Sequence, residues 1–222
     1  MRRGNFDATV RAPRRSFGAV VFDAASVGLS GLAAAFVVGG LARSLHASDV
    51  LAVAMAVPVG LLVADLVSAV AHWFCDTFFD SKTPLLGAVI GPFRLHHHDP
   101  DAFRRHDVCE RNRNNCLAAL PLLALAHCLT PRVAETGRPF VGAMLAVVAI
   151  ALASATQIHA WAHDRHAPGP VRWLQRCGIL LSRERHARHH REAHDRSYGI
   201  VNGWVNGALD RTGFFRRGSA VR

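Results

Sequence analysis

The chain has 222 residues, enough for one compact domain or a small helical bundle, and half of them are apolar. Its mean hydropathy of +0.16 is high for a soluble protein, yet its formal charge is +10. Apolar and basic blocks alternate, which favours a membrane protein with charged faces over a nucleic-acid-binding module. The five cysteines include no Cys-x-x-Cys pair, so we expect neither a disulfide scaffold nor a thiolate zinc site.

Four apolar stretches predict an all-α fold, a multi-pass transmembrane helical bundle. They cover residues 17–41, 50–72, 116–130 and 139–161. The first is longer than the apolar core of a secretory signal, so we interpret it as a retained membrane helix. The third is short and contains Pro121, so the alternatives are four spans, or three spans with a re-entrant segment. Residues 167–182 are amphipathic and predict a helix lying in the membrane interface.

The distribution of Lys and Arg predicts the orientation. Of the 26 basic residues, 23 lie before the first span, in the loop 73–115 or after residue 163, and three lie in the other two connections. By the positive-inside rule, both termini and the central loop are cytoplasmic. We therefore expect an integral membrane protein, in the inner membrane of a bacterium or the endoplasmic reticulum of a eukaryote.

Eleven of the 14 histidines form four clusters at the ends of apolar segments. The clusters are His72; His96, His97 and His98, with His106 nearby; His159 and His163; and His186, His189, His190 and His194. All four fall on the predicted cytoplasmic side, whereas His46 and His127 fall on the other. Clusters that are distant in sequence can therefore meet at one membrane face.

Spacing distinguishes the candidate ligands. His159 and His163 are four residues apart, which places them on one face of a helix. Residues 183–196 are compatible with a helix that would carry His186, His190 and His194 as a stripe, with His189 on its flank.

The remaining candidates lie at segment ends. His96 and His97 precede the turn signal Asp99-Pro100, and we favour both as ligands and His98 as a surface residue. Asp76, one turn after His72, would orient a ligand or bind the metal itself. Gln157 would orient a ring.

Two carboxylates that lie within the predicted spans are functional candidates, because ionisable groups are rare within membranes. Asp65 lies in the second apolar stretch and Asp23 in the first. The alternative for both is a pairing inside the bundle.

Eight to ten imidazoles are too many for one ion, so two ions in a shared histidine shell are predicted. Imidazole suits iron, zinc and copper, and the chain lacks the His-Glu-x-x-His motif of zinc proteases. A non-haem di-iron site that activates dioxygen against an unreactive C–H bond is the natural candidate. The non-enzymatic alternative is a metal-binding or haem-binding membrane protein.

The histidines lie within longer motifs. These are His72-Trp73-x-x-Asp76-Thr77; Gly91-Pro92-Phe93-Arg94-x-His96-His97-x-Asp99-Pro100; Arg105-His106-Asp107-x-x-Glu110-x-Asn112-x-x-Asn115-Cys116; Gln157-x-His159-x-Trp161-x-His163; His186-x-x-His189-His190-x-x-x-His194; and Tyr198-x-Ile200-x-x-Gly203-Trp204-x-Asn206. In order and spacing they resemble the plasmanylethanolamine desaturases, the Kua-type lipid desaturase family.

The resemblance implies an oxidoreductase that forms the vinyl ether double bond of plasmalogens from 1-alkyl-2-acyl-glycerophosphoethanolamine. Dioxygen would be the co-substrate, and a cytochrome b5-like or ferredoxin-like protein would supply electrons. Two irons would be held by His72, His96, His97, His159, His163, His186, His189 and His190, with His106 and His194 completing or supporting the shell. Related plant members desaturate an acyl chain, so an acyl-lipid desaturase or a hydroxylase is the alternative.

The resemblance also implies a domain division. Residues 1–45 would form a basic segment with the first span, 46–217 the lipid desaturase domain and 218–222 a short tail. Candidates for binding the lipid phosphate are Arg94, Arg104, Arg105 and Arg113, because guanidinium pairs well with phosphate. The alternative for each of them is that it only sets the membrane topology.

Overall fold

The computed structural model describes residues 15–78, 82–84, 87–99, 105–129, 138–191 and 194–216. Within these ranges the chain forms helices joined by turns and loops, and no β-strand occurs there. The prediction of an all-α fold is confirmed.

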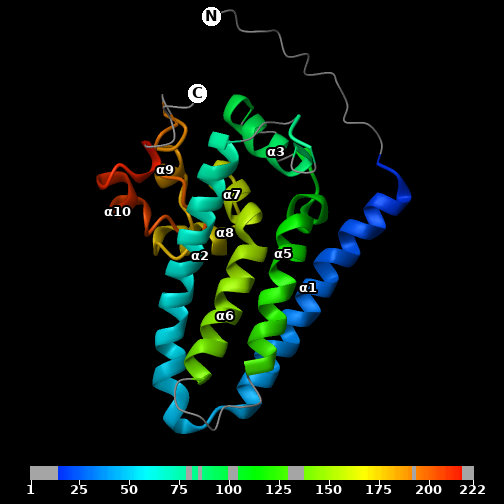
Figure 1. The fold of residues 1–222 in the computed structure, drawn as a ribbon, viewed down its shortest axis with the longest axis vertical. Coiled ribbons are helices and arrows are strands. Elements are labelled where there is room, and N and C mark those ends of the chain that lie inside the picture. Colours follow the sequence, from blue (N-terminus) through cyan, green and yellow to red (C-terminus); the bar gives the residue numbers. More distant parts are fainter. Residues whose placement is uncertain are drawn as a thin grey trace, which may run out of the picture.

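Four long helices run along the long axis of the molecule (Figure 1). They are α1 (Phe17–Ser44), α2 (Val50–Phe78), α5 (Val108–Leu129) and α6 (Arg138–Ala153), and a short 3-10 helix, η1 (Ala47–Asp49), leads into α2. Helix α6 packs between α2 and α5, and α1 packs against α5. The bundle therefore brings α2 and α6 together although the whole of α5 separates them in sequence.

Small residues allow the helices to approach closely. A Cβ atom added to Gly60 of α2 would lie 2.8 Å from the Cβ atom of Val147 on α6, so only glycine fits at this crossing. Alanines dominate the buried contact between α1, α5 and α6, where Ala119, Ala126 and Ala149 are almost wholly inaccessible. Such small-residue interfaces are typical of helices that pack within a membrane.

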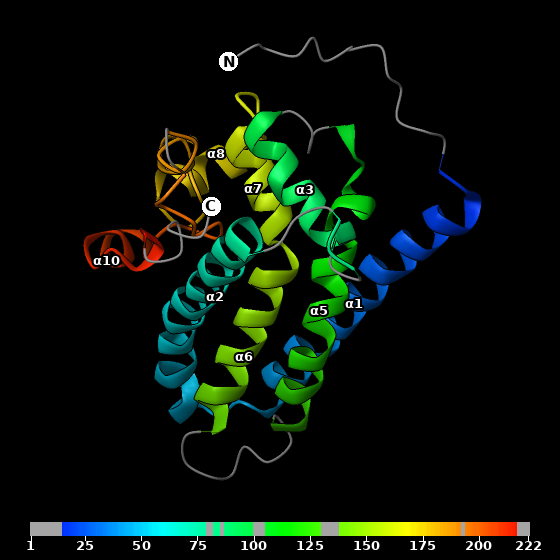
Figure 2. The ribbon, with the colours of Figure 1, turned by 45° about the horizontal axis from the view of Figure 1, so that its top comes forward.

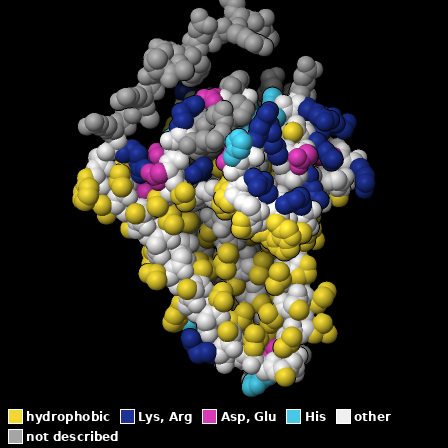
Figure 3. Space-filling view, turned by 180° about the vertical axis from the view of Figure 1, so that it is seen from behind, with side chains coloured by type: hydrophobic (Ala, Val, Ile, Leu, Met, Phe, Trp, Pro, Cys, Tyr) yellow, Lys and Arg dark blue, Asp and Glu magenta, His cyan; other side chains and the backbone are white. Residues whose placement is uncertain are grey.

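The outer faces of the bundle are apolar. Phe17, Leu32 and Leu51 are each more than 70% exposed, and apolar side chains cover the length of the bundle in the space-filling view (Figure 3). An apolar surface of this extent needs a covering, which a lipid bilayer provides.

Within the described part of the chain, two helical segments are long and apolar enough to cross a membrane, Phe17–Ser44 and Ala47–Phe78. The pair formed by α6 and α7 (Ala155–His163) makes a third if it is one span bent by 48°. Helix α5 begins ahead of the predicted apolar stretch 116–130, and its first turns carry Arg111 and Arg113. Because its first half is polar, α5 is not apolar enough over its length to count as a membrane-spanning helix by the same measure.

The shorter helices gather at one end of the bundle (Figures 1 and 2). They are α3 (Gly87–His98), α7, α8 (Gly169–Arg176), α9 (Arg183–His186) and α10 (Asn206–Arg211). Helix α8 is shorter than the predicted interfacial helix because Gly178, at φ 72°, ends it in a left-handed turn.

The prediction of a helix over residues 183–196 is wrong beyond His186. Helix α9 ends there, turns follow, and His194 and Ser197 have positive φ angles of 42° and 58°. The chain leaves the helical path because the C-terminal segment folds back against α2.

Candidate metal centre

Nine histidines converge at the end of the bundle where the short helices gather. They come from α2, α3, α7, α9 and the loop after α9: His72, His96, His97, His159, His163, His186, His189, His190 and His194. The bend between α6 and α7 directs α7 into this region. Convergence of the four sequence clusters was a prediction from topology, and the fold brings nine of their members together.

Five of these rings form one compact group. The Nε2 atoms of His159, His163 and His186 make a triangle with sides of 2.8, 2.9 and 3.3 Å. The Nε2 atom of His190 lies 3.0 Å from that of His186. His96 belongs to the same group by the positions of its ring nitrogens.

A second group surrounds Asp76. It contains His72, His96, His97 and His189, so His96 is shared between the two groups. The Oδ2 atom of Asp76 lies 2.8 Å from Nε2 of His97, 3.3 Å from Nε2 of His72 and 3.7 Å from Nε2 of His189. The carboxylate therefore points at the inner nitrogens of the rings, the Nε2 atoms that face the centre of the group, as a ligand would. It does not point at the outer nitrogens, the Nδ1 atoms.

Backbone carbonyls hold the Nδ1 atoms of two rings of this group, on the side away from Asp76. Nδ1 of His72 lies 3.1 Å from the carbonyl oxygen of Tyr198, and Nδ1 of His189 lies 2.9 Å from that of Arg196. A carbonyl only accepts, so both rings donate from Nδ1. In a neutral ring, Nε2 then presents its lone pair to the interior of the group, which is how a metal-binding histidine is held.

A third group joins His97, His190 and His194. The Tyr198 hydroxyl donates to the carbonyl oxygen of His194 at 2.5 Å, which secures the left-handed turn at that residue. Tyr198 thereby supports both His72 and His194 from one position.

The donor set fits metal ions. Imidazole nitrogens bound about 2.1 Å from one ion in neighbouring positions lie about 3 Å apart, and the Nε2 separations in the first group are 2.8–3.3 Å. In the second group a carboxylate oxygen faces imidazole lone pairs, an arrangement that a cation stabilises. Eight imidazoles and a carboxylate in two groups with a shared member are enough ligands for two ions.

Burial favours the neutral form of the imidazoles. It lowers the pKa of His189 to about 3, and together with the charge of neighbouring imidazoles it lowers the pKa of His190 to about 2. Burial, followed by the charge of neighbouring rings, also holds the pKa values of His96 and His186 well below their usual range. These rings are neutral at physiological pH, so they do not need to release a proton before binding a metal.

Other predicted residues lie elsewhere. His106 is 40% exposed and its Nδ1 lies 2.9 Å from a carboxylate oxygen of Glu110, outside the three histidine groups. Gln157 accepts a hydrogen bond from Asn112 at 3.4 Å and so connects α7 with α5. His127 packs against the ring of Phe36. The side chain of His98 and all of Arg104 lie outside the described residues.

The two candidate carboxylates in the spans have partners within the fold. Asp23 forms ion pairs with Arg15 and Arg113. Asp65 is fully buried, and its Oδ1 atom accepts from the backbone N–H groups of residues 201–203 while Oδ2 accepts from Val205. The sequence left two alternatives for each residue, a functional role or a pairing inside the bundle. The structure shows a pairing for both.

How the histidines are supported was not evident from the sequence. Tyr198 and Arg196 act through carbonyl oxygens, and Asp65 acts through the loop that follows them. The signals in the sequence were the motif from Tyr198 to Asn206 and the position of Asp65 within an apolar stretch, and neither indicates these contacts.

Comparison with known proteins places the chain among lipid desaturases. The family model described as lipid desaturase domain matches residues 61–221. The chain is 38% identical over 161 residues to plasmanylethanolamine desaturase of Myxococcus xanthus, with 72% of this chain and 57% of that protein covered. It is also 38% identical over 182 residues to plasmanylethanolamine desaturase 1 of Mus musculus, with 80% and 66% covered.

A plant relative is similar as well. Chloroplastic fatty acid desaturase 4 of Arabidopsis thaliana is 34% identical over 168 residues, with 73% of this chain and 49% of that protein covered. The chain thus spans about half to two thirds of the length of these relatives. No solved structure matches it. The resemblance noted in the sequence is confirmed, and the chain belongs to the lipid desaturase domain family.

Proposed function

We propose that the protein is a membrane lipid desaturase with two non-haem irons, and that it forms the vinyl ether double bond of plasmalogens. The observation that carries this proposal is the pair of histidine groups sharing His96, with Asp76 directed at the second. Membership of the lipid desaturase family supports it. The substrate would be 1-alkyl-2-acyl-glycerophosphoethanolamine, since two relatives are named plasmanylethanolamine desaturases.

Iron bound at this centre would supply the activation of dioxygen that protein side chains lack. Overall, one hydrogen leaves each of the first two alkyl carbons after the ether oxygen. Dioxygen is reduced to two waters with the two electrons and two protons so released, two further electrons from a carrier and two protons from solvent. The chain's own part is to hold neutral imidazoles in place through the carbonyls of Tyr198 and Arg196. Packing of His72, His96, His159, His186 and His189 to below 2% exposure keeps bulk water from the centre.

The proposed ligands are His72, His96, His97, His159, His163, His186, His189 and His190, with His194 supporting the shell. Asp76 is proposed as a further ligand because it faces inner ring nitrogens. His106 and Gln157 would act from outside the groups, through their contacts with Glu110 and Asn112. We retain residues 46–217 as the proposed extent of the desaturase domain.

The proposed topology is four spans, α1, α2, α5 and the bent pair α6–α7, or three with α5 re-entrant. Lys and Arg side chains gather at the end of the molecule that carries the histidines (Figure 3). By the positive-inside rule that end, with both termini, is cytoplasmic. A soluble cytochrome b5-like or ferredoxin-like donor would then reach the centre from the cytoplasm, and the basic surface would steer an acidic donor towards it.

The test is lipid analysis after expression in a host that lacks plasmalogens. New vinyl ether lipid, with loss of two hydrogens from the alkyl lipid, is the expected result. A product that gains one oxygen instead would identify a hydroxylase. No lipid change, despite iron in the purified protein and a working electron donor, would overturn the proposal.

A second candidate function is desaturation of an acyl chain. It is favoured by the similarity to a chloroplastic fatty acid desaturase. The same lipid analysis separates the two functions, because a double bond in an acyl chain survives mild acid whereas a vinyl ether is cleaved to an aldehyde.

A further inference from the structure

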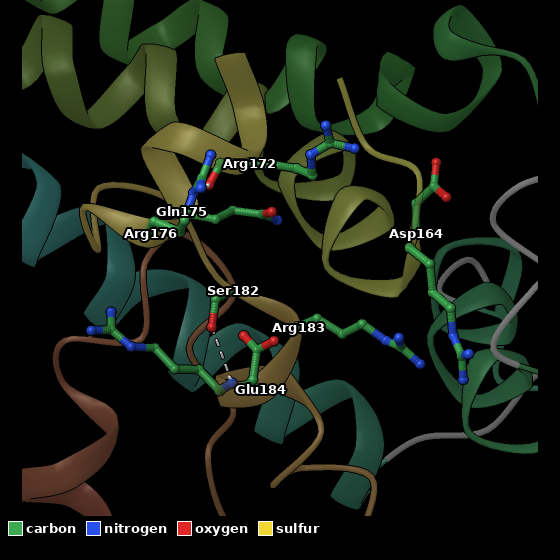
Figure 4. Close-up of a pocket in the computed structure, with 9 residues that line it drawn as sticks. Asp164, Arg172, Gln175, Arg176, Ser182, Arg183 and Glu184 are labelled. Carbon is green, nitrogen blue, oxygen red and sulfur yellow. Dashed lines mark hydrogen bonds between the residues drawn. The ribbon is translucent and has the colours of Figure 1, made fainter. Parts of the chain in front are cut away.

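A cavity of about 660 Å³ lies next to the histidine centre, between the end of α7, helix α8 and helix α9 (Figure 4). Five of its nine lining residues are arginines and two are carboxylates. The lining therefore carries a surplus of positive charge. A concave site with such a surplus concentrates anions.

The arginines come from three segments of the chain. Arg172 and Arg176 lie one turn apart on α8, Arg183 begins α9 on the other side of the cavity, and Arg165 follows the end of α7. Figure 4 shows Arg172 and Arg176 on one side and Ser182 and Arg183 on the other. Arginines placed around a hollow can surround a tetrahedral anion, because each guanidinium offers several donors in one plane.

One arginine of the lining is already held in place. Nη1 of Arg185 donates to the carbonyl oxygen of Asn202 at 2.7 Å, which fixes one wall of the cavity to the C-terminal segment. Arg172, Arg176 and Arg183 are exposed to solvent and line the hollow, and Nε of Arg176 donates to the carbonyl oxygen of Arg172 on its own helix at 3.3 Å. They are the residues available to a ligand.

The surroundings of the cavity point to a lipid. Trp173 is 57% exposed, and Trp204 and Ile179 are 39% and 37% exposed. The indole N–H of Trp204 donates to the carbonyl oxygen of Gly178 at 2.7 Å, which holds that ring beside the end of α8. Exposed tryptophans next to arginines are typical of the membrane interface, where lipid phosphates lie.

Among the arginines expected from the sequence to bind phosphate, the three that the structure describes have other partners. Arg94 donates to the carbonyl oxygen of Asp76 at 2.7 Å, Arg105 pairs with Asp99, and Arg113 pairs with Asp23. These three guanidinium groups are used to hold the fold together. A phosphate site is therefore better provided by the cavity.

We propose that this cavity binds the phosphate of a membrane glycerophospholipid headgroup, with Arg172, Arg176 and Arg183 as the residues that bind it. The inference rests on the proposed function, because it gives the lipid substrate a fixed position beside the centre. The cavity lining is joined to the proposed metal ligands by very short stretches of chain: Arg165 lies two residues after His163, and Arg185 immediately precedes His186. A headgroup held here anchors its lipid next to the histidine ligands.

The test is calorimetric titration of the full-length, iron-loaded protein in an uncharged, phosphate-free detergent. The ligands are a short-chain phosphatidylethanolamine, a diacylglycerol with the same chains, and inorganic phosphate. We compare the wild type with the double variant Arg172→Gln/Arg183→Gln and with Arg211→Gln, a matched exposed arginine on α10 outside the cavity. Unchanged iron content in each variant shows that the histidine centre has formed.

The double variant should bind the phospholipid at least about tenfold more weakly, and Arg211→Gln should bind it like the wild type. Binding of diacylglycerol should be the same in all three proteins. Equal phospholipid affinity in all three would overturn the proposal. Inorganic phosphate binding as tightly as the phospholipid would also overturn it, by identifying a site for a free anion.

Two further results separate this inference from others. If the double variant binds lipid normally but loses activity only with an acidic electron carrier, the cavity docks the carrier and the lipid proposal is wrong. If the wild type shows the expected lipid binding but forms no vinyl ether, the cavity is still the headgroup site and the proposed reaction is wrong. Because binding is measured without turnover, the two failures are distinguishable.

Discussion

Asp65 of α2 accepts a hydrogen bond from the backbone N–H of Gly203 at 3.0 Å, across 138 positions of sequence. The same carboxylate accepts from Val201, Asn202 and Val205. Gly203 has φ 74°, a left-handed conformation that suits glycine and directs successive N–H groups towards one acceptor. A buried carboxylate in a span thus holds the segment whose carbonyls orient His72 and His189.

Replacing Asp65 with Asn should disturb the centre from a distance. The amide NH2 would face a backbone N–H where a carboxylate oxygen accepts now, so at least one buried donor would lose its acceptor. We expect a loss of roughly 2–4 kcal/mol in stability, together with lower iron content, measured by thermal unfolding and metal analysis. Asp49→Asn is the control, because Asp49 accepts from His46 in an exposed turn. Normal iron content and stability in Asp65→Asn would contradict the anchoring role.

The proposed ligand His163 should be indispensable. Its Nε2 atom lies 2.9 Å from that of His186, so alanine would remove one corner of the first group. We expect His163→Ala to reach the membrane but to form product more than about 100-fold more slowly, a larger effect than the ~10–100-fold typical of residues supporting a ligand. The readout is vinyl ether lipid by mass spectrometry.

The control for that variant is His127→Ala, since His127 packs against Phe36 and belongs to none of the histidine groups. It should keep iron and activity. Wild-type turnover by His163→Ala would refute the ligand assignment. Loss of iron in His127→Ala would contradict the distinction between the histidines that bind metal and those, such as His127, that do not.

The crossing of α2 and α6 depends on Gly60. A Cβ atom there would lie 2.8 Å from Val147 Cβ and 3.0 Å from the carbonyl oxygen of Met144, so Gly60→Ala forces the two helices apart. We expect a destabilisation of about 1–3 kcal/mol, the usual cost of overpacking. Gly28→Ala in α1 has nothing within 4 Å of the added atom and should be neutral or slightly stabilising. Thermal unfolding in detergent compares the two variants, and equal melting temperatures would contradict the close packing.

Removal of the metal should make stability depend on pH. In the iron-free protein, burial holds the pKa values of His189 and His190 at about 3 and about 2, whereas unfolded histidines titrate near 6.5. The unfolded state then binds more protons below about pH 6.5, so stability falls as the pH falls through that value. After chelation, the melting temperature should drop between about pH 7.5 and pH 5.5. A constant melting temperature over that interval would show that these rings are not buried as neutral imidazoles.

Sequence patterns predicted much of the site. The clusters around His72, His96, His159 and His186 were recognisable by composition, and the uneven distribution of Lys and Arg predicted that they share one end of the molecule. Local spacing was sufficient for His159 and His163, because both lie on a regular helix. It was insufficient for His190 and His194, because the chain after His186 is held in turns by contacts distant in sequence, such as that of His72 with the carbonyl oxygen of Tyr198.

Composition, apolar length and motif order were therefore enough to determine the helical class, the family resemblance and the set of candidate ligands, since these depend on residue type and local periodicity. Tertiary structure alone decided which nitrogens face one another and that Asp76 points at inner ring nitrogens. It also assigned Asp65 to the C-terminal loop and Arg113 to Asp23. The physical reason is that backbone acceptors and ion-pair partners are chosen by three-dimensional proximity, which leaves no periodic trace in the sequence.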